Sequence, residues 1–127
     1  MLFRSAAVRA ALAIVKVIKE DNALRRAQGK LPVRMRIGLH SGPVVVGNIG
    51  APGRVNYTVV GDTVNVANRF EQLGKEFMKP EDDVVLLVSG GTLAALTDRE
   101  ALGIALPQPE YRPIKGHDQP VEVYRLA

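Results

Sequence analysis

The chain has 127 residues, 46% of them apolar, which suits one globular domain or part of one. It carries 17 basic and 13 acidic residues, so its net charge of +4 is a mild excess that would complement a polyanion such as a nucleotide. The absence of cysteine excludes disulfides, a thiol nucleophile and a thiolate metal site, and it fits a cytoplasmic localisation. No apolar run reaches the length of a membrane span, and an aromatic content of 5% argues against a nucleic-acid surface built on base stacking.

The first predicted element is an amphipathic helix that ends near Gly29, before Pro32. The lack of acidic residues before Glu20 is shared with targeting peptides, but the apolar run 10–15 is short for a signal core. An ordinary helix explains the pattern better, because five apolar residues fall on one face at helical spacing: Val8, Ala11, Leu12, Val15 and Ile18.

Short strands are expected next. Apolar and polar residues alternate over 33–40, a turn follows at 41–42, and a second apolar stretch covers 43–48. This pattern predicts a β-hairpin over 33–48. A loop at 50–54 and a third strand at 55–60 follow.

A second helix is predicted from about Thr63 to Phe77, with Asp62 as its N-cap. Three apolar residues at spacing three give it a face to bury, namely Val64, Ala67 and Phe70. Asn65 and Arg69 stand four apart on a different face. That face is either an exposed polar surface or a platform in a cleft, from which Arg69 donates hydrogen bonds to a phosphate and Asn65 positions a neutral polar group.

The remainder reads as a strand at 82–89, buried on both sides by its composition, and a short helix at 91–96. Two further strands are expected at 109–115 and 120–126, separated by a turn at 116–119. Helices mixed with short strands predict an α+β fold, a sheet layered with helices.

Other candidate groups have simpler interpretations. The "GNIG" at 47–50 has the spacing of a GxxG loop, but it follows a strand and lacks the lysine of a P-loop, so a turn is favoured. His40 and His117 are interpreted as packed or solvated side chains rather than metal ligands. Lys115, before Gly116, can extend toward a phosphate or remain a solvated surface lysine.

Two long stretches carry a family resemblance. "VRMRIGLHSGPVVVGNIG" followed by "RVNYTVVGDTVNVANRFEQLG" resembles the catalytic domain of class III adenylyl and guanylyl cyclases. The match continues in order through the preceding "AAVRAALAIVKVI" and the closing "IKGHDQPVEVYRL". The resemblance implies a ferredoxin-like α+β nucleotide cyclase sheet with covering helices, of which residues 1–127 are the C-terminal portion. It also implies that two catalytic domains meet head to tail and share active sites at their interface.

The same resemblance implies roles for four residues. Asn65 would orient the nucleotide ribose, and Arg69 would stabilise the transferring phosphoryl group. Thr58 would read the purine edge, where threonine goes with adenine. Lys115 would contact the terminal phosphates.

The family's two metal-binding aspartates and its purine-selecting lysine lie upstream of the first helix of this sequence. The resemblance therefore implies an N-terminally truncated domain without its own metal ligands, although the intact family enzyme uses Mg²⁺ or Mn²⁺. The parent would convert ATP to 3′,5′-cyclic AMP and pyrophosphate in intracellular signalling, and this chain alone is expected to be inactive. The alternative is a non-catalytic cyclase-like module that binds a partner or a nucleotide without turnover.

Assembly is expected to follow from the truncation. Without the missing strands, strand edges and the apolar stripe through Leu12, Val15 and Ile18 are predicted to lose part of their cover. A homodimer or larger assembly, possibly domain-swapped, is therefore expected.

Overall fold

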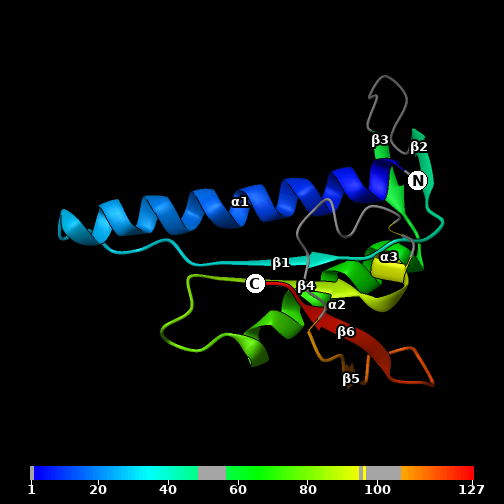
Figure 1. Ribbon diagram of the computed structural model, residues 1–127. Helices are drawn as coiled ribbons and strands as arrows, with labels where there is room; N and C mark the ends of the chain where they lie inside the picture. Colours follow the sequence, from blue (N-terminus) through cyan, green and yellow to red (C-terminus); the bar gives the residue numbers. More distant parts are fainter. Residues whose placement is uncertain (1, 49–56, 95, 97–106) are drawn as a thin grey trace.

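The computed structural model describes residues 2–48, 57–94, 96 and 107–127 (Figure 1). In chain order the elements are α1 (Leu2–Ala27), β1 (Met35–Leu39), β2 (Val45–Asn48), β3 (Tyr57–Val60), α2 (Asp62–Phe77), β4 (Val84–Ser89), α3 (Gly90–Ala94), β5 (Glu110–Arg112) and β6 (Val121–Arg125).

Four strands form one mixed sheet in the order β1-β4-β6-β5, with β1 parallel to β4 and the other pairs antiparallel. Two more strands, β2 and β3, form a separate antiparallel pair. The α+β class predicted from the sequence is confirmed.

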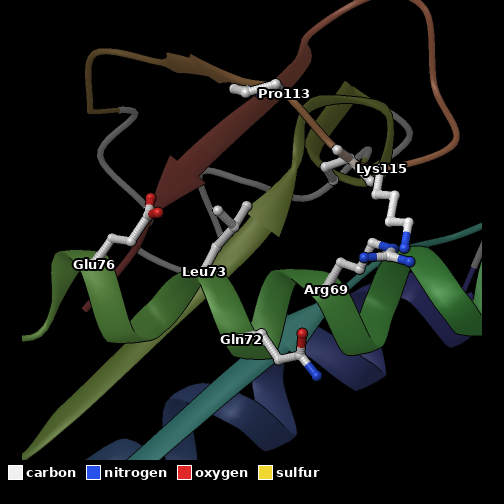
Figure 2. A pocket seen from close by; sticks show the side chains of 7 residues that line it. Arg69, Gln72, Leu73, Glu76, Pro113 and Lys115 are labelled. Atoms are coloured by element: carbon white, nitrogen blue, oxygen red, sulfur yellow. The ribbon is translucent and has the colours of Figure 1, made fainter.

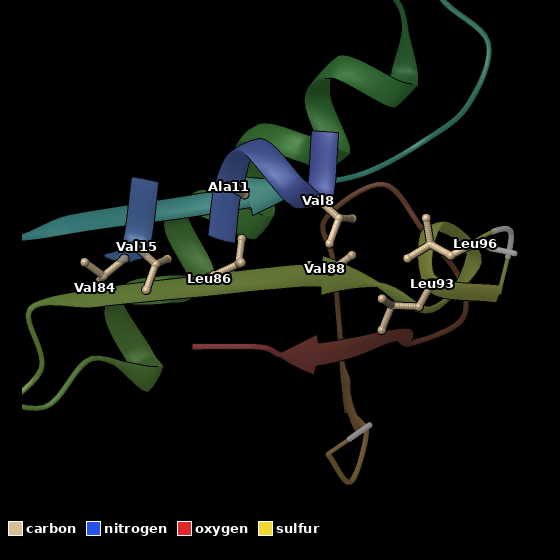
Figure 3. Packing of buried hydrophobic residues seen from close by; sticks show 8 residues of the cluster. All are labelled: Val8, Ala11, Val15, Val84, Leu86, Val88, Leu93 and Leu96. Atoms are coloured by element: carbon tan, nitrogen blue, oxygen red, sulfur yellow. The ribbon is translucent and has the colours of Figure 1, made fainter. Parts of the chain in front are cut away.

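β4 is a central strand, with α1 on one face of the sheet and α2 on the other. Alternate side chains of a strand point to opposite faces, and those of Val84, Leu86 and Val88 pack in the cluster with α1 (Figure 3). The intervening Val85 and Leu87 pack in the cluster with α2. All six residues of β4 are buried, which explains its continuous apolar sequence and confirms that prediction.

α1 follows the sequence prediction closely. Val8, Ala11 and Val15 are buried against the sheet, and the half-buried Leu12 and Ile18 pack on the same cluster. Val15 of this stripe is buried against the face formed by β1 and β4, whereas Leu12 and Ile18 are only half-buried, so the expected partial loss of cover is contradicted at Val15 alone. Among the described residues, no helix is both long enough and apolar enough to span a bilayer.

The predicted hairpin over 33–48 is also wrong. β1 pairs in parallel with β4, with Ile37 opposite Leu86, whereas β2 pairs with β3, with Val45 opposite Val60. Figure 1 shows the β2–β3 pair near the N-terminal end of α1, apart from the four-stranded sheet. The alternating pattern of 33–40 identified a strand, but a parallel partner is brought in by a long crossover and leaves no local turn signal.

α2 lies directly on β1, and a glycine makes this approach possible. A Cβ atom at Gly38 would lie 2.5 Å from the backbone nitrogen of Glu71 and 2.7 Å from the carbonyl oxygen of Ala67. Phe70 is fully buried, as predicted, and Val66 is buried beside it although the predicted stripe did not include it. The other two predicted positions, Val64 and Ala67, are only half-buried.

The predicted N-cap of α2 is wrong. Gly61 is the N-cap and makes no side-chain capping bond, while Asp62 is the first helical residue. The Asp62 carboxylate instead lies 3.3 Å from the imidazole Nε2 of His117. A carboxylate in the first turn still interacts favourably with the helix dipole.

Candidate functional site

Arg69 and Lys115 lie together at a surface depression of about 190 Å³, between α2 and the segment that follows β5. In Figure 2 the ends of their side chains point toward one another. The described residues that line it are Arg69, Gln72, Leu73, Glu76, Pro113, Ile114 and Lys115. We call this feature the Arg69–Lys115 depression.

A second depression, of about 120 Å³, adjoins the first along α2. The described residues that line it all have polar side chains: Asn65, Asn68, Arg69 and Gln72. Arg69 and Gln72 line both hollows. Asn65 is exposed and Arg69 is half-buried. Asn65 lines the second hollow together with Arg69, one helical turn away, but it does not line the first hollow, which holds Lys115.

A tight turn presents Lys115. The amide of His117 donates to the carbonyl oxygen of Ile114 at 3.0 Å, and Gly116 has φ of 91°. A bond between the first and fourth residues with positive φ at the third is the pattern of a type II β-turn, which favours glycine at that position. Ile114 is 4% exposed and packs in the cluster below α2, so it anchors the turn while Lys115 projects outward.

The cations of this site carry no ion pair with any residue that the structure describes, whereas the carboxylate of the site does. Glu76 binds Arg112, with Oε2 and Nη1 3.1 Å apart. Arg112 also binds Glu110 at 2.7 Å and lies over the ring of Phe77, 4.8 Å from its centre. The negative charge at Glu76 is thus balanced locally, and the end of the depression near Arg69 and Lys115 is left positive, as an anion requires.

Thr58 lies on a different element, β3, opposite Gly47 of β2. The described residues that line the two depressions belong to α2 and to the segment after β5. Of the "GNIG" motif, Gly47 and Asn48 belong to β2, and residues 49–50 lie outside the described part of the chain.

His40 is a packed side chain, which is one of the two interpretations, packed or solvated, that the sequence left open. Its Nδ1 lies 3.0 Å from Ser89 Oγ, Ser89 Oγ lies 2.8 Å from Thr92 Oγ1, and Thr92 donates to Ser41 at 2.9 Å. Because the Thr92 proton is given to Ser41, Ser89 donates to Thr92 and accepts from His40 Nδ1. This order places a proton on Nδ1 of His40, and burial lowers the pKa of the ring, which favours its neutral form.

The described part of the chain contains no group of three or more His, Asp or Glu side chains that could hold a metal ion.

The sequence reasoning missed Asn68, Gln72 and Glu76 as lining residues. Their signal was present, because they continue the helical spacing from Asn65 and Arg69. No local pattern indicated Pro113 or Ile114.

Residues 3–124 match the family described as Adenylate and Guanylate cyclase catalytic domain. The chain belongs to this family. Adenylate cyclase 1 of Rhizobium meliloti is 34% identical over 126 residues, and the adenylate cyclase of Anabaena cylindrica is 32% identical over 124. These alignments cover 95% and 94% of this chain but only 17% and 24% of the two relatives.

Solved cyclase structures share the fold. The adenylyl cyclase CyaB from P. aeruginosa superposes with a TM-score of 0.76 at 30% identity, covering 98% of this chain and 58% of that one. The guanylyl cyclase Cya2 gives 0.74 at 30% identity, covering 95% and 56%. The cyclase fold expected from the sequence is confirmed. The chain spans under two thirds of the length of each of these relatives.

Proposed function

We propose that residues 1–127 are the C-terminal portion of an adenylate cyclase catalytic domain, whose parent converts ATP to 3′,5′-cyclic AMP and pyrophosphate. The observation that carries the proposal is the convergence of Arg69 and Lys115, from segments far apart in the sequence, on one depression next to Asn65. The choice of ATP is supported by the threonine at Thr58 and by the two relatives named adenylate cyclase.

In the proposed reaction, the ribose 3′-hydroxyl attacks the α-phosphorus of ATP, the 3′,5′ ring closes, and pyrophosphate leaves. Negative charge grows on the phosphoryl oxygens and on the leaving group during this step. Arg69 would donate hydrogen bonds to the transferring phosphoryl group, and Lys115 would neutralise the departing phosphates. Asn65 would hold the ribose so that its hydroxyl lies in line with the reacting phosphorus.

The described residues do not fit a Mg²⁺ or Mn²⁺ site, because they contain no suitable cluster of ligands. Arg69, Lys115 and Asn65 would act through their own side-chain hydrogen bonds and charges. We predict that the 127-residue chain by itself forms no cyclic AMP.

We also propose a homodimer or larger assembly, possibly domain-swapped. Among the described residues, no strand pairs with the outer edge of β1. In β2, Val45 and Val46 are 64% and 60% exposed, although their side chains point to opposite faces of the strand. An isolated two-stranded pair is marginally stable, so a second chain would supply the missing contact.

A chimera tests the catalytic proposal. Residues 1–127 would replace the matching part of CyaB, and cyclic AMP production from ATP would be measured. We expect activity, and we expect Arg69→Ala to reduce kcat by about 10²–10³, the usual loss when one donor to a developing oxyanion is removed. Lys30→Ala, at an exposed lysine after α1, is the control and should change nothing.

An active chimera that is insensitive to Arg69→Ala would contradict the role of that residue. A folded chimera that binds ATP without turnover would favour the non-catalytic module.

A further inference from the structure

His117 and Asp62 join the two elements that form the Arg69–Lys115 depression. The imidazole Nε2 of His117 lies 3.3 Å from Asp62 Oδ2, and their side chains are 31% and 74% exposed. His117 ends the turn that presents Lys115, and Asp62 opens the helix that carries Arg69. The contact therefore links the turn directly to α2.

The positions of these residues fit one another. Asp62 and Arg69 are seven residues apart, so they lie on one face of α2, two turns from each other. Lys115 and His117 flank Gly116, whose positive φ turns the chain. His117 thus meets α2 at Asp62. Lys115 faces the same helix at Arg69 (Figure 2).

The contact differs from the other restraints on the turn because it involves a histidine. Histidine is the side chain that changes charge between pH 5 and 8. A protonated imidazole makes an ion pair with Asp62, whereas a neutral imidazole makes at most a hydrogen bond. The buried anchor Ile114 and the turn hydrogen bond contain no titratable group.

We propose that His117 is a positioning residue that fixes Lys115 through Asp62, so that the affinity of this site for a polyphosphate is higher when the imidazole of His117 is charged than when it is neutral. This inference rests on the proposed function, because it assumes that Lys115 binds the phosphates of the nucleotide.

Asp62 of α2 contacts His117, and His40 after β1 interacts with it electrostatically. Lys115 and Asp118 are its charged neighbours in the sequence. Among these groups His40 is the other histidine. Burial lowers the pKa of His40 and so moves its charge change toward acid. A variant that alters His117 alone separates the two histidines.

The test measures the binding of inorganic tripolyphosphate to the 127-residue chain by calorimetry at pH 6 and pH 8. For each protein, the dissociation constant at pH 8 is divided by the dissociation constant at pH 6. This ratio is compared between variants because tripolyphosphate itself titrates in this range. His117→Lys keeps a cation at both pH values. Exposed ion pairs contribute little, so we expect the ratio for the unaltered chain to exceed that for His117→Lys by about two- to fivefold.

Asp62→Asn distinguishes positioning from direct contact with the anion. If His117 acts through Asp62, Asp62→Asn lowers the ratio to that of His117→Lys. If His117 touches the phosphates itself, Asp62→Asn retains the ratio of the unaltered chain, and the inference is wrong. Equal ratios for the unaltered chain and His117→Lys would overturn it as well.

Lys115→Ala separates this inference from the proposed function. We expect it to weaken binding at both pH values. Unchanged binding in Lys115→Ala, or no binding by the unaltered chain, would refute the phosphate site and with it the role of His117. If Lys115→Ala weakens binding as expected but His117→Lys leaves the ratio of dissociation constants unchanged, only the positioning role of His117 is refuted.

Discussion

Gly38→Ala should disrupt the contact between β1 and the helix that carries Arg69. The added methyl carbon would lie 2.5 Å from Glu71 N, 2.7 Å from Ala67 O and 2.9 Å from Phe70 Cβ. Ordinary contacts at such an atom begin near 3.4 Å. The first two atoms are helix backbone, so a flexible side chain cannot simply swing aside and α2 must move.

The expected cost follows from this crowding. Inserting a methyl group into a packed interior typically destabilises by about 1–3 kcal/mol, and the backbone clash points to the upper end. The entropy of unfolding is about 2.1 cal/mol/K per residue near 60 °C, or roughly 0.27 kcal/mol/K for a chain of this length. A loss of about 3 kcal/mol would therefore lower Tm by roughly 11 °C.

Thermal unfolding followed by circular dichroism measures this change. Gly91→Ala is the matched control, because a Cβ there meets no atom within 4 Å, its φ is not positive, and alanine favours the helix α3. We expect the control to unfold at or slightly above the temperature of the unaltered chain. If Gly38→Ala unfolds at the same temperature as Gly91→Ala, the close packing of α2 on β1 is refuted.

Two further variants test buried polar groups. Asn22 is fully buried and exchanges hydrogen bonds of 2.6 and 2.7 Å with the backbone of Val33. Asn22→Ala should therefore lower the free energy of unfolding, measured in urea, by about 1–3 kcal/mol. An unchanged urea midpoint would show that these bonds do not hold the backbone at Val33 to α1. Burial lowers the pKa of His40 below its ordinary 6.5, so the unfolded chain binds more protons, and stability should decline as pH falls from 6.5 toward the folded value. Urea midpoints from pH 5 to 8 should show a smaller decline for His40→Asn, and parallel curves would contradict this assignment.

The sequence alone predicted the local elements that have a strong internal pattern. The 3.6-residue period of Val8, Ala11 and Val15 identified α1 and its buried face, and the apolar run 84–88 identified a strand covered on both sides. Gly116 indicated the turn that presents Lys115. The family resemblance rested on the order of the motifs, and the matched residues 3–124 confirm it.

Only the tertiary structure decided which elements meet. The hairpin expected over 33–48 failed because the burial of both faces of β4 selects β1 as its parallel neighbour, and no local turn encodes that choice. Asp62 likewise had the sequence context of a cap, but the folded chain brings His117 to its carboxylate. Arg69 and Lys115 were separate candidates until α2 and the turn after β5 packed on the same side of the sheet around Ile114. Short-range patterns fix the period and direction of a segment, whereas the partner of each face is set by the total burial that the whole chain can reach.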